Sequence, residues 1–249
     1  MSWSLRRLVR GEPPVPSAPA GVASSDERLV PIGRLEAFSD GVFAIAITLL
    51  VLELHVPAGH GPLLKALEGE WPRYLGYFVS FAFIGGVWVA HSSLTRFIKA
   101  ADADLMRLNL MLLLFVSFLP FTTAIASTHL FVSFLAFEGL NVSTTSERIA
   151  VVVFGLNLTL AALMVYLVLR RAGRTRDLPA DNLAEEELQA FARERRSALL
   201  LQATATIVGV FLPLLAVVFY LALAIFFVID PLPRIRRARR RARAPDQPA

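Results

Sequence analysis

An arginine, a serine and an aspartate stand at the start of the first long apolar run of the chain. Residues 34–40 read RLEAFSD, and residues 41–54 continue as GVFAIAITLLVLEL. A charged side chain at the centre of a membrane helix costs about 2.5–3.5 kcal/mol on insertion scales, so such residues usually have a structural or functional role. An ionised Asp40 beside this run must therefore find hydrogen-bonding partners inside the protein.

Three other polar side chains could partner Asp40. His91 lies in the segment GVWVAHSSL, Asn109 lies in MRLNLMLLL, and Arg34 precedes Asp40 on the same predicted helix. A satisfied cluster of this kind can simply fix how the helices pack against one another. It can also act in gating or proton sensing, since ionisable groups inside membranes often mark ion pathways. Both interpretations stay open at this point, and one cluster could serve both.

A second set of residues on the same segment forms an aliphatic stripe. At about 100° per residue, one face of a helix here carries three aliphatic side chains and a hydroxyl. These residues are Ile45, Thr48, Leu49 and Leu52. Ser39 and Asp40 fall on the other side, so they cannot serve the same surface. Glu53, at the far end of the segment, could concentrate cations there.

The rest of the chain must hold this segment in a membrane. Hydrophobic residues make up 55% of the 249 residues, and the mean hydropathy is +0.58. Several apolar runs are long enough to cross a bilayer core of about 30 Å. They fall at about 35–55, 74–95, 105–127, 149–169 and 198–229. The sequence therefore predicts an all-α, polytopic membrane protein.

The last apolar run is too long for one straight span. At 1.5 Å per residue, its roughly 32 residues would extend about 48 Å. Pro213 lies in its middle, where a proline either kinks one tilted helix or marks the turn of a hairpin. The hairpin would join two short helices over about 198–212 and 214–229.

Arginine-rich flanks decide between these alternatives. The positive-inside rule counts lysines and arginines in short segments next to the spans. Such clusters precede the first run, separate the second from the third, and follow the fourth and the last, where the tail reads RIRRARRRAR. The connections over 55–73 and 127–148 carry few basic residues. All basic flanks lie on one side only if the number of spans is even, so we predict six transmembrane helices with both termini cytoplasmic.

These features divide the chain into three parts. Residues 1–33, rich in proline, alanine and serine after a basic start, are predicted to be a disordered cytoplasmic lead-in. Residues 34–230 form the six-helix transmembrane domain, in which 179–200 is an amphipathic cytoplasmic helix that runs into the fifth span. Residues 231–249 form a basic cytoplasmic tail that contacts anionic lipid. The sequence pI of about 10.2 follows from these flanks, so no nucleic-acid partner is expected.

Motifs for catalysis and cofactor binding are missing from the sequence. The chain has no cysteine, which excludes disulfides, thiolate metal sites and cysteine nucleophiles. It also lacks GxxxxGK[ST], GxGxxG, HExxH and GxSxG, as well as the TVGYG filter of potassium channels. We therefore expect no enzyme activity, no catalytic residue, no cofactor and no metal site. A protein of this kind that conducts ions must do so without a carbonyl filter.

The segment RLEAFSDGVFAIAITLLVLEL resembles the first helix of the prokaryotic branch of the endosomal and lysosomal potassium channel family. The hallmark of that family, Arg-x-x-x-Phe-Ser-Asp, falls on Arg34, Phe38, Ser39 and Asp40. The resemblance continues through GVWVAHSSLTRF and LNLMLLLFVSFLPF, and with the six-span layout it covers about 35–230.

This resemblance implies a potassium-permeable channel in the cell membrane of a prokaryote. The resemblance implies a homotetramer in which four copies of the first helix line one central pore, with K⁺ as the permeant ion. The family's aliphatic constriction matches Ile45, Leu49 and Leu52 in this sequence, and its hydroxyl layer matches Thr48. A narrow apolar neck gates by dewetting, and we expect it to give modest selectivity for K⁺ over Na⁺.

In the same interpretation, RLEAFSD locks the orientation of the pore helix. Ser39 and Asp40 would be held by the bundle, so that the aliphatic stripe faces the pore. A proton-coupled transporter built on Asp40 and His91 is the alternative, although the sequence shows no internal repeat of the kind that many transporters have. A nonconducting membrane scaffold is the third hypothesis.

Overall fold

The computed structural model describes residues 30–55, 62–95, 98, 100–131, 145–172 and 182–229. Most of the predicted lead-in and the whole basic tail over 231–249 lie outside these residues. Val30 and Pro31, at the end of the predicted lead-in, form the short strand β1, and this strand pairs antiparallel with β2 (Ala100–Ala101). The two-residue ladder joins the start of the first helix to the connection between the second and third spans.

The first span is helix α1 (Ile32–Leu49), which continues as the 3₁₀ helix η1 (Leu50–Glu53). Pro31 precedes its first helical residue, a place where the missing N–H of proline costs no helical hydrogen bond. The short α2 (Leu63–Gly69) then leads into α3 (Trp71–Thr95). These elements match the first two predicted spans, with α3 beginning a few residues before its predicted start.

The third predicted span, 105–127, is helical but not continuous. It consists of α4 (Ala103–Ser117), α5 (Leu119–Ala126) and a π-helical turn η2 (Ser127–Phe131). Pro120 explains the break, because proline lacks an N–H and its ring clashes with the carbonyl of the residue four positions earlier. The fourth span is α7 (Thr145–Ala172).

The predicted hairpin at Pro213 is confirmed. Helix α8 (Asn182–Phe211) ends just before this proline, and α9 (Pro213–Ile229) begins with it and packs back against α8. Gly209 permits the close approach of the two helices, since a Cβ there would lie 2.5 Å from the Cβ of Ala216. The predicted amphipathic connector and the fifth span form one helix, because α8 runs unbroken from Asn182.

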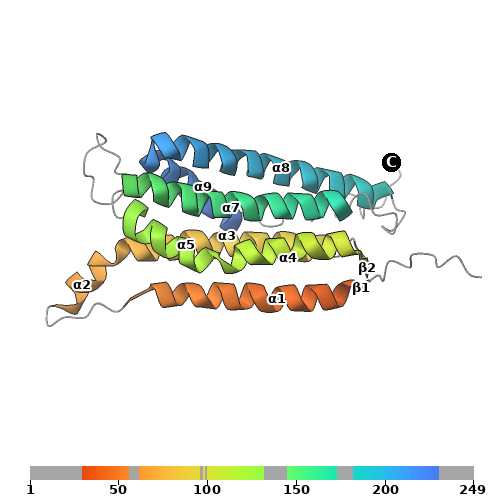
Figure 1. Cartoon of the computed structure of the whole chain (residues 1–249), viewed down its shortest axis with the longest axis horizontal. Helices are drawn as coiled ribbons and strands as arrows, with labels where there is room; N and C mark the ends of the chain where they lie inside the picture. The colour runs from red at the N-terminus through yellow and green to blue at the C-terminus, as the bar shows by residue number, and fades with distance from the viewer. Residues whose placement is uncertain are drawn as a thin grey trace, which may run out of the picture.

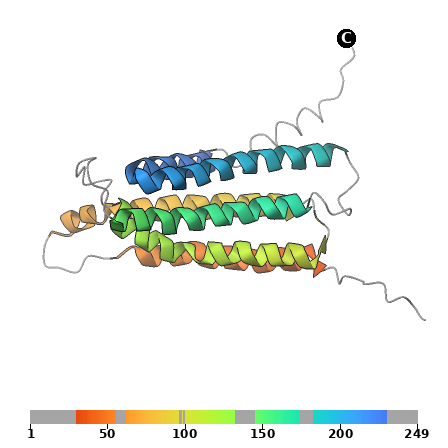
Figure 2. The same ribbon diagram turned by 45° about the horizontal axis from the view of Figure 1, so that its top comes forward.

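The helices pack as three layers of two (Figure 1 and Figure 2). One layer holds α1 and α4, the middle layer holds α3 and α7, and the last layer holds α8 and α9. Contacts between layers run along two rows, α1–α3–α9 and α4–α7–α8. Helix α1 therefore stands at a corner of the bundle, with two sides uncovered within the subunit.

Four helical segments in the described part of the chain are long and apolar enough to cross a membrane. They are Ile32–Glu53, Trp71–Thr95, Ala103–Phe131 and Thr145–Ala172. A shorter apolar stretch, Leu215–Phe226, lies in α9. The fold is therefore that of a mostly helical membrane protein, and the six-span arrangement stays a prediction.

Candidate functional site

Helix α1 has one face in the protein core. Ser39, Phe43, Ala46 and Leu50 are all essentially inaccessible to solvent. They recur every three or four residues, which is the spacing of one helix face. The contacts of α1 are with α3 and α4, so this face is the surface that fixes the helix to the bundle.

The opposite face of α1 is uncovered within the subunit. All four residues of the predicted stripe are exposed: Ile45, Thr48, Leu49 and Leu52. Phe38 is exposed as well, and Arg34 lies on the exposed side one turn before it. The predicted separation of the stripe from Ser39 is therefore present in the structure, while the role of the stripe in a pore stays a prediction.

A directed chain of hydrogen bonds holds the buried face of α1. The Nε2–H of His91 donates to Oδ1 of Asn109 at 2.8 Å, since a carbonyl oxygen can only accept. Nδ2 of Asn109 donates to Oγ of Ser39 at 2.9 Å, and this hydroxyl donates to the backbone oxygen of Leu35 at 2.8 Å. The three side chains are buried, and they come from α3, α4 and α1. His91 and Asn109, which the sequence offers as partners of Asp40, thus meet Ser39 instead.

His91 is constrained from a second side by the core. The ring of Phe43 on α1 lies 5.7 Å from the imidazole ring, centre to centre. Nδ1 of His91 is buried and has no hydrogen-bond partner in the described part of the protein. One ring nitrogen thus fixes Asn109, and the other is left without a donor.

The predicted direct pairing of Asp40 with His91, Asn109 or Arg34 is wrong. Oδ1 of Asp40 instead accepts a hydrogen bond from Nε1 of Trp88 at 2.9 Å. Successive residues on a helix point about 100° apart, so Ser39 faces the core while Asp40 faces the flank of α3 where Trp88 is partly exposed. Arg34 lies six residues before Asp40, which places it on a different side of α1.

Two further contacts of α1 lie outside the set predicted from the sequence. Thr95, at the end of α3, donates from Oγ1 to Oε1 of Glu36 at 2.9 Å. The indole of Trp88 is the other, and its sequence signal is an N–H donor within an apolar run, which needs an acceptor when it is removed from water. Together with the bond of Ser39 to Asn109, these contacts attach the first turns of α1 to α3 and α4 at three positions, Glu36, Ser39 and Asp40.

The stripe crosses a change of helix type. The α-helical pattern ends at Leu49, and Leu50–Glu53 are 3₁₀ helical. Oγ1 of Thr48 donates to the backbone oxygen of Ile45 at 2.9 Å, which uses its hydrogen and leaves a lone pair free on the exposed side. Glu53 is partly exposed at the end of η1, and Nδ1 of His55 lies 3.0 Å from its backbone oxygen.

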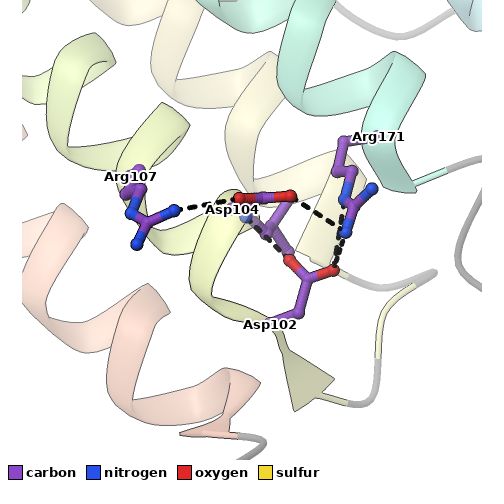
Figure 3. A network of polar contacts seen from close by, with 5 residues as sticks. Asp102, Asp104, Arg107 and Arg171 are labelled. Atoms are coloured by element: carbon purple, nitrogen blue, oxygen red, sulfur yellow. Dashed lines mark hydrogen bonds and ion pairs between the residues drawn. The ribbon is translucent and has the colours of Figure 1, made fainter. Parts of the chain in front are cut away.

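An ion-pair cluster anchors the same end of the bundle at which α1 begins (Figure 3). Asp102 caps α4 by accepting from the backbone N–H of Leu105 at 2.8 Å, and its second oxygen accepts from Nη2 of Arg171 at 2.6 Å. Arg171 also pairs with Asp104 at 3.2 Å, and Arg107 pairs with Asp104 at the same distance. Since β2 directly precedes Asp102, this cluster connects the base of α1 to the end of α7.

Burial and hydrogen bonding have opposite effects on the pKa of Asp102. Removal from water by itself raises the pKa of this carboxyl, but the bonds from Leu105 and Arg171 outweigh burial and hold the pKa below its ordinary value. Asp102 is therefore an ionised capping residue at neutral pH. The sequence signal for it is an aspartate immediately before a long apolar run, the usual position of an N-cap.

No group of three or more histidine, aspartate or glutamate side chains in the described residues is arranged to hold a metal ion. The polar groups around α1 are instead used in pairs and chains that position helices. The arrangement thus consists of one membrane-capable helix with a fixed polar back and an exposed aliphatic front.

Comparison with known proteins gives three relevant similarities. The model of the family "Endosomal/lysosomal potassium channel TMEM175" matches residues 34–120. A potassium channel of Streptomyces collinus is 49% identical over 100 residues, which cover 39% of this chain and 48% of that protein. The chicken (Gallus gallus) endosomal/lysosomal proton channel TMEM175 is 39% identical over 120 residues, which cover 44% of this chain and 24% of that protein.

A solved structure extends the similarity beyond the matched segment. The crystal structure of a lysosomal potassium-selective channel TMEM175 homolog from Chamaesiphon minutus is 30% identical to this chain, with a TM-score of 0.64. The superposition covers 80% of this chain and 97% of that one. By sequence, the chain spans about half the length of the bacterial relatives that it matches.

Proposed function

This chain belongs to the TMEM175 family of endosomal/lysosomal potassium channels, and we propose that it forms a potassium-permeable channel. In this proposal four copies assemble around one axis, and α1 of each copy lines the pore. The chain crosses the cell membrane of a prokaryote six times, with both termini in the cytoplasm. The basic flanks of the spans support this orientation through the positive-inside rule.

The two-faced character of α1 is the observation that carries the proposal. In the 18-residue apolar window of its span only 22% of the residues are buried inside the subunit, against 67% in the corresponding window of α3. Its back is nevertheless held by a buried chain of polar groups, which is costly in a membrane and fixes the rotation of the helix. A helix that only faced lipid would not require its rotation to be fixed in this way. A pore-lining helix needs its rotation to be fixed, so that the same exposed side chains always face the pore.

The stripe would form the narrow part of the pore. Four copies each of Ile45, Leu49 and Leu52 give rings of aliphatic side chains, which offer an ion no ligand. Such a neck excludes hydrated ions when it is narrow and passes them at a dehydration cost when it widens. K⁺ holds its water less tightly than Na⁺, so this mechanism favours K⁺ modestly. The free lone pair of Thr48 supports it by offering oxygen ligands between the aliphatic rings.

The test is the reversal potential of the purified protein in planar bilayers with K⁺ on one side and Na⁺ on the other. A pore lined by α1 predicts a reversal towards the K⁺ equilibrium potential and discrete single-channel steps. Leu49→Ala should raise the conductance and reduce the K⁺ preference, because it removes one apolar ring. Leu200→Ala is the matched control, since Leu200 is an exposed leucine on α8, far along the chain from the stripe. Equal effects of the two substitutions would contradict the proposal.

A proton-coupled transporter using Asp40 and His91 is the second candidate. The buried Nδ1 of His91, which has no partner among the described residues, favours it, and vertebrate relatives are named proton channels. The bond from Trp88 to Asp40 counts against a direct proton path between the two residues. Current that follows an imposed pH gradient in the absence of K⁺ would support this candidate. Current that follows only the K⁺ gradient would remove it.

A further inference from the structure

An apolar groove lies between α3 and α9, two helices of the row α1–α3–α9. Its volume is about 560 Å³, and its lining includes Tyr77, Phe78, Phe81, Leu221, Ala224 and Ile225. Phe78, Phe81 and Ile225 are 62%, 42% and 56% exposed. The groove is therefore open, and the described part of the subunit does not fill it.

A matching ridge lies on α4 and α5, which contact α1. Leu110, Leu114, Phe118 and Phe121 are exposed and follow one another at intervals of four, four and three residues. This spacing places them on one face of the broken helix α4–α5. The rings of Phe118 and Phe121 lie 5.0 Å apart, so the end of the ridge is a pair of packed aromatic side chains.

The groove and the ridge lie at the same depth in the membrane. Oγ of Ser80 on α3 and Oγ1 of Thr123 on α5 are hydrogen bonded at 2.6 Å, which fixes the relative heights of the two helices. The two helices run in opposite directions. Phe81 therefore lies one residue, and Phe121 two residues, from this bond towards the same end of the bundle. With a rise of 1.5 Å per residue, their depths differ by only about 1.5 Å.

We propose that the last three residues of the ridge, Leu114, Phe118 and Phe121, of one subunit fill the α3–α9 groove of the next subunit around the pore. This inference rests on the tetrameric pore proposed above. If α1 stands at the axis, the faces on its two sides must meet in a ring, which is a heterologous interface that closes on itself. The corner position of α1 provides these two faces, one along α1–α3–α9 and one along α1–α4. Rotation about an axis parallel to the helices preserves depth, so ridge and groove meet in register.

Packing explains why a subunit would take this place rather than lipid. In a membrane the hydrophobic effect does not drive apolar helices together, and association depends on close van der Waals contact. Rigid aromatic rings fill a groove lined by Tyr77, Phe78 and Phe81 more completely than a mobile acyl chain. A lipid chain is the competing occupant, and the experiment must separate the two.

The absence of cysteine in the natural chain makes disulfide mapping direct. The variant Phe121→Cys/Phe81→Cys joins ridge and groove, and Phe121→Cys/Ile207→Cys is the matched control, because Ile207 is an exposed residue of α8 outside the groove. Both variants are oxidised in lipid vesicles and separated on non-reducing gels. The first pair should give a ladder up to tetramer, about tenfold stronger than the control, since a disulfide forms only when Cα atoms approach to about 7 Å or less.

The mass of the same variants in detergent distinguishes failure of the groove contact from failure of the tetrameric pore. A tetramer by mass with no ladder from Phe121→Cys/Phe81→Cys would overturn the groove contact and leave the proposed channel intact. Lipid retained in the groove of that tetramer, detected by native mass spectrometry, would do the same. A monomer by mass would instead overturn the tetrameric pore, and the groove contact with it. Phe121→Ala gives an independent readout: it should shift the tetramer towards smaller species, whereas Leu200→Ala should not.

Discussion

Asn109 on α4 and Ser39 on α1 are joined by a hydrogen bond of 2.9 Å, although 70 positions separate them in the sequence. Because the amide of Asn109 also accepts from His91, one side chain determines how three helices are placed relative to each other. The bond acts on the buried face of α1, so it determines which residues remain on the exposed face. The position of the aliphatic stripe is thus decided by a residue on a different helix.

Removing this amide should destabilise the bundle. Asn109→Leu keeps the approximate size of the side chain but leaves the N–H of His91 and the hydroxyl of Ser39 with one partner fewer. We expect a loss of about 1–3 kcal/mol, the usual cost of leaving a buried polar group unpaired. Thermal unfolding in detergent measures it. Met111→Leu, an exposed substitution two residues away, should be close to neutral, and an equally stable Asn109→Leu would contradict the positioning role.

Loss of the indole N–H of Trp88 should change gating more than folding. Trp88→Phe keeps an aromatic ring on α3 and removes the donor to Asp40. A hydrogen bond to a charged group is worth about 1.5–3 kcal/mol. We expect this bond to be made in only one of the two gating states, so its loss should change the ratio of open to closed channels by about tenfold or more. Single-channel recording measures this ratio. The control is Trp71→Phe at the far end of α3, and unchanged gating in Trp88→Phe would show that Asp40 does not depend on this donor.

Substitution of Thr48 should affect selectivity without closing the pore. Thr48→Val preserves the shape of the side chain and removes the only hydroxyl of the stripe. We expect the permeability ratio of K⁺ to Na⁺ to fall by about two- to fivefold, equivalent to about 1 kcal/mol or less for one hydrogen-bonding group. The reversal potential with K⁺ and Na⁺ on opposite sides measures it. Thr48→Ser should retain most of the preference; a ratio that does not differ between Val and Ser would exclude a role for the hydroxyl.

The ion pair of Asp102 should lose its stabilising effect in acid. Its pKa in the folded protein lies below the ordinary value of 3.8, so the contribution is fully present above the unfolded pKa and is lost as the pH falls through the folded one. Asp102→Asn keeps a capping oxygen and removes the charge, so it should cost about 1 kcal/mol at pH 7. The difference from the natural chain should shrink as the pH falls below the unfolded value of 3.8 and vanish once Asp102 is protonated in the folded protein.

Thermal unfolding of both proteins across this pH range measures the effect. A difference that stays constant from pH 7 to the acid limit would show that the charge of Asp102 is not what stabilises the end of α7. Arg107→Gln is a suitable comparison, because Arg107 is largely exposed and, among the described residues, pairs only with Asp104; its effect should be small.

The sequence alone predicts the elements whose signals lie within the segment itself. Hydropathy gives the first four spans. Pro213 marks a break in the last run, because a proline cannot continue a helix without the loss of a hydrogen bond, and the basic flanks favour a hairpin there over a kink. The sequence also singles out His91 and Asn109 as polar residues in apolar runs that need partners, but it assigns them to Asp40, whereas the structure joins them to Ser39. Helical periodicity alone gave the grouping of the stripe on one face of α1, away from Ser39.

Other features depend on packing that periodicity does not contain. Trp88 is an ordinary aromatic residue until the rotation of α3 places its N–H beside Asp40. The β1–β2 ladder has only two residues on each strand, too few for any pattern of alternation. The α3–α9 groove is formed by residues far apart in the sequence, so it becomes visible only when the helices are assembled.

The 3₁₀ turn at the end of α1 gives the proposed neck a particular shape. A 3₁₀ helix has three residues per turn, so side chains three positions apart eclipse one another. Leu52 therefore comes closer to lying directly beyond Leu49 than it would in an α-helix, where the two would diverge by about 60°. Four subunits would build a sleeve of two stacked leucine rings, about 6 Å long at a rise of 2.0 Å per residue. Beyond the Thr48 hydroxyls at its Leu49 end, the sleeve would offer an ion no side-chain oxygen, so the resistance of the pore would depend on the sleeve's length as well as on its width.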